Sequence, residues 1–463
     1  MYQLDQAEIG GYQVARIWDE LPDGTRCAAL KPENWNGTLL LDLDGADNCR
    51  TEGPTAAAQA PRLAAFFSQG YAYGGINREA VGYRFPDAVQ LLVDVRTAFA
   101  GFFGAPEYTV AIGGSRGAFV GRMCMEFRPD VFAGALVYGG GGSGEIAALN
   151  SKLDGKWTLN ALLRPEEPLI LAEIPDLREE ERKLGALIEQ AKEMPLGRAR
   201  LALAAAFEQL PAWADPSAPE PAADDCEEQF RQLLTCFQFA QFNFGSYTIE
   251  QLAGGPVSWN TGVDYSALLE RSGRKAFVAG MYALAGDGEA ALARDLETLA
   301  AAPRVQASPA AVARAEKYLT YAAKLTGPVV NLDNIGDQVD PESGKYAYRD
   351  TLKKAGKEDL LRVLWVHSSG HCNFTNAEVL EALAVLMRRI RDGVWGDLAP
   401  ERLNQEASRL GLPVVPGMKL GPAPRPETPE ETRENAVTAH FFDYTPAPAL
   451  RAWDFENWDS YKG

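Results

Sequence analysis

The chain has 463 residues, a formal net charge of −18 and a pI near 4.8. Its length is too great for one simple core and predicts a large domain with an insertion, or two domains. A surface this acidic repels phosphate backbones, which argues against nucleic acid as a partner. The sequence contains no apolar, uncharged window of about 18 residues, so we expect neither a membrane span nor a membrane partner.

The amino-terminal residues MYQLDQAEIGGYQ have no basic region followed by an apolar region, so they do not form a signal peptide. The sequence therefore predicts a cytoplasmic protein, or an exported one whose leader lies outside this sequence. Six cysteines occur without C-x-x-C spacing, which disfavours a zinc ribbon or a redox pair. The sequence leaves open whether Cys226 and Cys236 pair, and whether the protein forms a homodimer.

Strand and helix patterns alternate in the first part of the chain, residues 1–149. After a β-rich start over 1–30, strands are predicted over 38–43, 71–77, 108–112 and 131–140, and helices over 60–70 and 85–104. This alternation is typical of a parallel α/β sheet with helices on both faces. Right-handed crossovers then place the loops that follow each strand at one edge of the sheet.

The pattern changes over residues 150–326, where long helical stretches replace the strands. We interpret this segment as a helical cap inserted into the α/β domain. The alternation resumes over 327–397, with predicted strands at 327–332 and 360–366. The remaining tail, 398–463, is rich in Pro and Glu and then in aromatic residues, and we expect its end to dock on the core.

One strand, turn and helix pattern carries the clearest chemical signal. The run YTVAIGGSRGAFV contains G-x-S-x-G between a β-branched strand and a helix, with Ser115 at the centre. Glycines are expected at Gly113 and Gly117, because the turn is too sharp for side chains there. This arrangement is a nucleophile elbow, which holds the serine hydroxyl at a helix amino terminus.

A neutral serine hydroxyl is a poor nucleophile and needs a nearby base. Of the three histidines, His371 follows a predicted strand and Gly370, whereas His367 lies in that strand and His440 lies in the tail. We therefore predict His371 as the base. The H-x-x-x-H spacing of His367 and His371 would suit a zinc site on a helix. The predicted strand before His371 disfavours that interpretation.

A carboxylate should orient the base and stabilise its charged form. Asp337 follows a predicted strand and the flexible Gly336, and we predict it as the third member of a catalytic triad. Asp333 and Asp340 are competing candidates. The chain order Ser115, Asp337, His371 is the order of the α/β-hydrolase plan.

With these motifs the chain resembles the α/β-hydrolase superfamily over about residues 30–150 and 325–395. GGSRGA, the D-x-V-x-P run at 337–341, and GHCNFT are similar to bacterial esterases and prolyl-oligopeptidase-like hydrolases. The His371-Cys372 pair resembles the tannase and feruloyl esterase group, in which that cysteine forms a disulfide with a cysteine before the serine. Here Gly114 stands before the serine, so the disulfide is absent.

The resemblance implies an α/β-hydrolase fold and an oxyanion hole, with one N–H from Arg116 and another from Gly45 or Ala46. The Arg116 side chain either enters the site, faces solvent or pairs with the cap. Phe242, Phe244 and Trp259 are candidates for the substrate pocket. We predict no metal and no cofactor.

The predicted function is that of a serine esterase, a carboxylesterase that cleaves the ester of a bulky or aromatic small molecule through an acyl-enzyme. An amidase, peptidase or lactonase with the same triad is the alternative within the enzyme class. A non-catalytic binding protein with this fold is the alternative of another class, although such proteins usually lose one triad member.

Overall fold

The computed structural model describes residues 2–216, 218–237, 245–286, 288–410, 412 and 439–451. The chain forms two compact units. The α/β unit comprises Met1–Gly141, Tyr321–Asn334 and Arg349–Tyr444. The helical unit comprises Gly142–Thr320, Ile335–Tyr348 and Thr445–Gly463. None of the described helices is long and apolar enough to cross a membrane.

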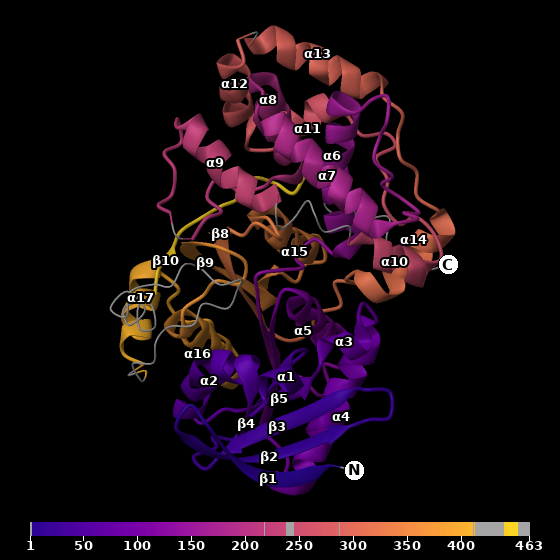
Figure 1. The fold of residues 1–463 in the computed structure, drawn as a ribbon. Helices are drawn as coiled ribbons and strands as arrows, with labels where there is room; N and C mark the ends of the chain where they lie inside the picture. The colour runs from indigo at the N-terminus through magenta and orange to yellow at the C-terminus, as the bar shows by residue number, and fades with distance from the viewer. Residues whose placement is uncertain are drawn as a thin grey trace. The chain divides into compact units, whose positions relative to one another are not determined.

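The described strands form one ten-stranded sheet in the order β1-β2-β3-β5-β4-β6-β7-β8-β9-β10 (Figure 1). The strands are β1 (Gln3–Ile9), β2 (Tyr12–Glu20), β3 (Arg26–Pro32), β4 (Thr38–Asp42), β5 (Ala72–Ile76), β6 (Tyr108–Gly114), β7 (Gly134–Tyr138), β8 (Val329–Gly336), β9 (Leu361–Ser369) and β10 (Phe441–Phe442). Neighbouring strands from β5 through β4, β6 and β7 to β8 are parallel, so their carboxyl ends share one edge. The mostly parallel order confirms the predicted α/β-hydrolase fold.

Helices cover both faces of this sheet. The α/β unit contains α1 (Gly45–Asn48), α2 (Gly53–Ser68), α3 (Arg78–Val81), α4 (Phe85–Phe103), α5 (Arg116–Phe127), α16 (Asn376–Asp392), α17 (Pro400–Ser408) and the 3₁₀ helix η2 (Glu358–Leu360). Helix α4 packs against α5 and against β3, β4 and β5, whereas α2 packs against α16. The central strands are buried on both faces, which explains why they read as continuous apolar runs in the sequence.

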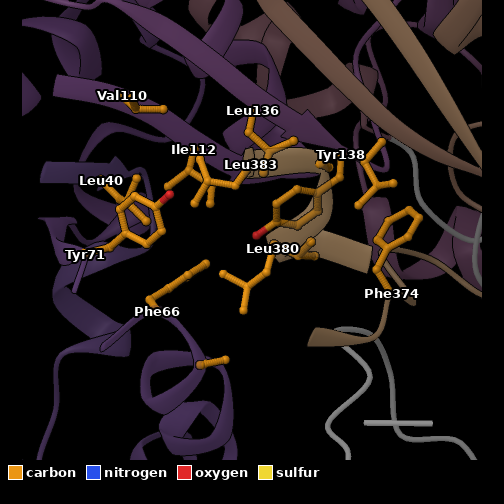
Figure 2. Close-up of a cluster of buried hydrophobic side chains, with 14 of the residues drawn as sticks. Leu40, Phe66, Tyr71, Val110, Ile112, Leu136, Tyr138, Phe374, Leu380 and Leu383 are labelled. Carbon is orange, nitrogen blue, oxygen red and sulfur yellow. The ribbon is translucent and has the colours of Figure 1, made fainter. Parts of the chain in front are cut away.

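One hydrophobic core cluster of the α/β unit lies between the sheet and the pair α2 and α16. Figure 2 shows strand residues such as Ile112 and Leu136 facing Phe66 of α2 and Leu383 of α16. All four side chains are at most 2% exposed. This packing fixes the positions of the loops at the carboxyl edge of the sheet.

The helical unit has its own hydrophobic core. Its described residues between 142 and 320 form helices and no strand. Its helices are α6 (Glu145–Leu163), α7 (Leu177–Lys192), α8 (Pro195–Glu208), α9 (Cys226–Cys236), α10 (Ser246–Ala253), α11 (Tyr265–Arg271), α12 (Lys275–Leu284), α13 (Gly288–Ala301) and α14 (Pro309–Leu319). Helix α15 (Glu342–Lys354) begins in this unit and ends in the α/β unit. All six cysteines are free thiols, so Cys226 and Cys236 do not pair.

The described part of the tail contributes to both units. Phe441 and Phe442 form the edge strand β10, which pairs antiparallel with β9. Farther along, Leu450 belongs to the core of the helical unit. The aromatic residues Trp453 and Trp458 lie outside the described residues.

Candidate active site

Ser115 lies in the tight turn between β6 and α5. Its backbone has φ 56° and ψ −124°, a strained conformation for a residue with a side chain. A Cβ on Gly113 would lie 2.9 Å from the backbone carbon of Gly117, and a Cβ on Gly140 would lie 2.9 Å from the Cα of Ser115. These close approaches require glycine, so the turn has the geometry of a nucleophile elbow.

The two glycines of the motif differ in the space around them. A Cβ on Gly117 would meet nothing nearer than the Asp42 Oδ1 at 3.4 Å, which is an ordinary contact. The expectation of a clash at Gly117 is therefore wrong. The close approach of the two backbones depends on the missing side chain of Gly113, not on that of Gly117.

His371 lies in the loop after β9, between Gly370 at φ 95° and Cys372 at φ 54°. The side-chain amide of Asn334, on β8, donates to the carbonyl of Gly370 at 2.8 Å and holds this loop. The side chain of Asn373 donates to the carbonyl of Ser369 at 2.6 Å. The loop is therefore fixed on both sides of the histidine.

Ser115 and His371 line the same cavity, which has a volume of about 620 Å³. The other two histidines lie elsewhere. The ring of His367 packs edge-on against Phe442, with centroids 5.2 Å apart, and its backbone N–H donates to the carbonyl of His440. Of the three histidines, only His371 shares a cavity with the serine.

Gly114 has no room for a side chain. A Cβ there would lie 2.5 Å from the Tyr138 ring and 3.0 Å from the Cys372 Sγ. The cysteine of the tannase-like pair is thus directed at the residue before the serine, where this chain has glycine. The Cys372 thiol also lies 3.7 Å from the His371 Nε2.

The cavity belongs to the α/β unit and combines aromatic and charged side chains. It is lined by Asp42, Asp44, Asp47, Asn48, Arg50, Thr55, Gln59, Arg62, Leu63, Phe66, Tyr73, Arg78, Gly114, Ser115, Tyr138, His371 and Cys372. Leu63, Phe66 and Tyr138 form its apolar part. Most of these residues carry no recognisable motif, and sequence reasoning did not single them out.

Asp42, the last residue of β4, is only 4% exposed. Its Oδ2 accepts from the Tyr73 hydroxyl at 2.8 Å, and its Oδ1 accepts from the Asp44 N–H at 3.1 Å. Burial, with the nearby carboxylate of Asp44, raises the pKa of Asp42 to about 7. Asp42 therefore carries less negative charge near neutral pH than an ordinary aspartate.

The other two cavity carboxylates are each paired with arginine. Arg78 donates to both carboxylate oxygens of Asp44. Asp47 pairs with Arg26 at 2.5 Å and with Arg50 at 3.3 Å. These pairs balance the negative charge of this part of the cavity.

Arg62 is the most deeply buried arginine of the cavity, at 3% exposed. Its Nη2 donates to the carbonyl of Phe374 at 2.8 Å, whereas Nε and Nη1 are buried with no hydrogen-bond partner among the described residues. Burial lowers the pKa of Arg62, although the guanidinium remains charged. The cavity therefore contains a cation with unused donors.

The predicted oxyanion donors lie at two helix starts. Arg116 is the first residue of α5, so its backbone N–H has no acceptor within the helix. Gly45 and Ala46 open α1, and a Cβ on Gly45 would lie 2.2 Å from the Gly74 oxygen of β5. The Arg116 side chain is partly exposed and lies 3.5 Å from the exposed carboxylate of Glu79 and over the Tyr83 ring, both of which belong to the α/β unit.

Asp337 follows β8 directly and is fully buried. The Lys345 Nζ lies 2.9 Å from its Oδ2, and its Oδ1 accepts from the N–H groups of Val339 and Asp340. Each carboxylate oxygen has two lone pairs, so these contacts do not exhaust its acceptors. Asp333 lies within β8 and is also fully buried, whereas Asp340 is only partly buried.

The predicted pocket residues are not among the described residues that line this cavity. Trp259 belongs to the helical unit, where its N–H donates to the Asn150 Oδ1 and its carbonyl accepts from Arg451. Phe242 and Phe244 lie outside the described residues. The described residues contain no cluster of three or more side chains suited to a metal.

Comparison with solved structures gives distant likenesses that cover most of the chain. Candida antarctica lipase A is 11% identical, with 92% of this chain and 94% of that one covered and a TM-score of 0.41. Feruloyl esterase B from Aspergillus oryzae is 12% identical, with 85% and 87% covered and a TM-score of 0.43. Tannin acyl hydrolase from Aspergillus niger is 11% identical, with 98% and 92% covered and a TM-score of 0.40.

The amino-acid sequence has a nearer relative, although no protein-family model matches it. The o-phthalyl amidase of Xanthobacter agilis is 31% identical over 427 residues, which cover 85% of this chain and 91% of the relative. An identity of this level over most of both chains shows common descent. The chain is a hydrolase of the α/β-hydrolase superfamily and belongs to the family of the o-phthalyl amidase.

Proposed function

We propose that the protein is a serine hydrolase that cleaves the amide of an aromatic acyl group of the o-phthalyl type. The observation that supports it most is the strained Ser115 in a cavity that it shares with His371. The relative, which is named as an o-phthalyl amidase, favours an amide over the ester expected from the motifs. The ester of the same acyl group remains the second candidate, because the same nucleophile and base serve both reactions.

The reaction would proceed in two steps. Ser115 Oγ attacks the amide carbonyl while His371 accepts its proton, and the tetrahedral intermediate then collapses as His371 gives the proton to the departing amine. Water next attacks the acyl-serine, with His371 again as the base. The acid leaves and the serine recovers its proton, so the net reaction consumes one water.

The oxyanion would be stabilised by backbone N–H groups at the two helix starts. Arg116 supplies one donor from α5, and Gly45 or Ala46 supplies the other from α1. Such donors are fixed before the reaction and act where negative charge develops. Removal of one donor typically costs about 3–4 kcal/mol of transition-state stabilisation.

Asp337 is our proposal for the carboxylate that orients His371. It follows the strand after which α/β hydrolases place their acid, and the chain order Ser115, Asp337, His371 fits that plan. Asp333, which is buried within β8, is the alternative. Substitution of each by asparagine separates the two assignments.

The aromatic part of the substrate would contact the apolar side of the cavity. Phe66 and Tyr138 line it together with Leu63, and the Phe66 ring stacks on Tyr73 with centroids 5.7 Å apart. Aromatic pairs favour another ring in offset or edge-on contact. A flat aryl acyl group is therefore a better fit than a long aliphatic chain.

The test compares an amide and an ester that share one acyl group. N-ethylphthalamic acid and monoethyl phthalate would be incubated with the purified protein and with Ser115→Ala, and released phthalate would be quantified by chromatography against an enzyme-free blank. We expect Ser115-dependent release from the amide. Release from the ester alone would replace the amidase proposal by the esterase, and release from neither, or equal release by Ser115→Ala, would contradict both.

A further inference from the structure

We propose that Arg62 is the receptor for a carboxylate on the substrate, so that the enzyme selects acyl groups that carry a free acid beside the scissile carbonyl. This inference rests on the proposed function, because it names the substrate class of the same cavity. It starts from two donors of Arg62, Nε and Nη1, which have no partner among the described residues.

An unpaired buried charge is costly, and proteins rarely retain one without a use. A buried donor without an acceptor costs about 1–3 kcal/mol, and more when it is charged. Arg62 is 3% exposed, its Nε and Nη1 contact no described acceptor, and the buried carboxylate of Glu378 acts on it without forming a hydrogen bond to it. A ligand with two acceptor oxygens would satisfy the donors and supply the missing negative charge.

The remaining charges of the cavity favour an anion at this place. Asp44 is neutralised by Arg78, and Asp47 is paired with both Arg26 and Arg50. Burial raises the pKa of Asp42 to about 7, which reduces its repulsion of a second carboxylate. In a chain with a net charge of −18, the cavity of the candidate nucleophile thus contains a buried cation with two donors that no described residue accepts, although the buried Glu378 acts on its charge from farther away.

The backbone places Arg62 close to the reacting groups. Its Nη2 holds the carbonyl of Phe374, three residues after His371, and the Phe374 ring packs edge-on against Tyr138 at 5.9 Å (Figure 2). A carboxylate at Arg62 would therefore lie on the same side of the cavity as the base. This proximity suits an acid group on the ring carbon next to the one that bears the reacting carbonyl, as in an o-phthalyl group.

The alternative is that Arg62 only positions the His371 loop through Phe374, and the experiment separates these two roles. Hydrolysis of N-ethylphthalamic acid, which carries the carboxylate, would be compared with that of N-ethyl-2-methylbenzamide, in which a methyl group replaces it. We expect the wild type to prefer the acid, and Arg62→Met to lower kcat/KM for the acid by about 30- to 100-fold. The loss for the neutral amide should be at least ten times smaller.

Two further variants act as controls. Arg62→Lys keeps the positive charge but cannot form the bidentate hydrogen bonds of arginine. It should therefore recover only part of the preference for the acid. Arg409→Met removes an exposed arginine of the α/β unit that lies outside the cavity lining and is paired with Glu406, and it should change both rates by the same small factor. Circular dichroism and a melting curve would show that each variant is folded.

A binding measurement decides the question without turnover. Calorimetric titration of phthalate into Ser115→Ala and into Ser115→Ala/Arg62→Met should show a Kd at least 30-fold weaker in the double variant. Equal Kd values, equal losses for the two amides in Arg62→Met, or a wild type that does not prefer the acid would each overturn the inference. A wild type that cleaves neither amide yet binds phthalate through Arg62 would refute the proposed function and leave the carboxylate site standing.

Discussion

The ion pairs of Asp154 and Asp337 in the helical unit and the Ser115 cavity of the α/β unit differ in how they hold buried charge. In the helical unit, Asp154 and Asp337 have fully buried side chains, and each meets a cation, Arg451 at 2.5 Å and Lys345 at 2.9 Å. In the α/β unit, Arg62 is buried without an ion pair among the described residues. Removal of one member of a buried ion pair destabilises the fold, because the other charge is then buried alone. A buried guanidinium with unsatisfied donors, in contrast, can still bind a ligand.

This difference predicts whether a substitution will lower stability or turnover. Loss of a member of a complete pair should lower stability, because the remaining charge is buried alone. Loss of a polar group in the Ser115 cavity should lower turnover more than stability. The following substitutions test this separation.

Substitution of the proposed base should have the largest effect on turnover. His371→Ala should lower kcat by about 10⁴-fold, because the serine then lacks a proton acceptor. His367→Ala is the matched control, since His367 packs against Phe442 at the edge strand and should retain turnover within about threefold. Steady-state rates on whichever of N-ethylphthalamic acid and monoethyl phthalate the wild type cleaves would check this. A similar loss in both variants would contradict the assignment.

Asp337 combines both kinds of role in our account. Asp337→Asn should lower kcat by about 10³- to 10⁴-fold and also destabilise the fold by about 3–5 kcal/mol, because Lys345 loses its buried partner. The double variant Asp337→Asn/Lys345→Met should recover stability in urea unfolding but not turnover. Recovery of turnover, or a full loss in Asp333→Asn with none in Asp337→Asn, would reject Asp337 as the orienting acid.

The two glycines of the elbow should respond unequally to an added methyl group. Gly113→Ala should destabilise the protein by about 1–3 kcal/mol and reduce turnover, because its Cβ would lie 2.9 Å from the backbone of Gly117. Gly117→Ala meets only an ordinary contact and gains helix propensity, so it should be close to neutral in stability. Equal melting temperatures for the two variants would contradict the described turn.

Asp42 should make a smaller, pH-dependent contribution to stability. Its pKa rises from an ordinary 3.8 to about 7 on folding, so between these values the folded state holds a proton that the unfolded state has lost. Its contribution to the free energy of unfolding therefore falls with rising pH in that window, by at most about 1.4 kcal/mol per pH unit. Asp42→Asn should remove this slope in urea titrations at several pH values, and an unchanged slope would indicate an ordinary pKa.

The sequence was sufficient to predict the sheet and the turn at Ser115, because each follows a local pattern, whereas the role of His371 as the base stays a prediction. Apolar runs become the buried strands, and glycines around Ser115 mark a turn that the backbone can form only there. The edge strand β10 was less predictable, because only aromatic residues in the tail pointed to docking.

The composition of the cavity could not be predicted in the same way. Arg62 lies on α2, next to Pro61, and reaches the carbonyl of Phe374, which is 312 residues away in the chain. No local pattern distinguishes such an arginine from an exposed one, because its burial depends on how α2 packs against α16. The raised pKa of Asp42 could not be predicted either, because it depends on burial and on the nearby carboxylate of Asp44.

The central claim, that Ser115 is an activated nucleophile, can be tested directly with a fluorophosphonate probe. The native protein would be labelled, digested and analysed by mass spectrometry, with Ser115→Ala and His371→Ala treated in parallel. We predict one adduct on the peptide that contains Ser115, no adduct in Ser115→Ala, and labelling slowed by orders of magnitude in His371→Ala. An unlabelled native protein, or equal labelling of Ser115→Ala, would contradict the account.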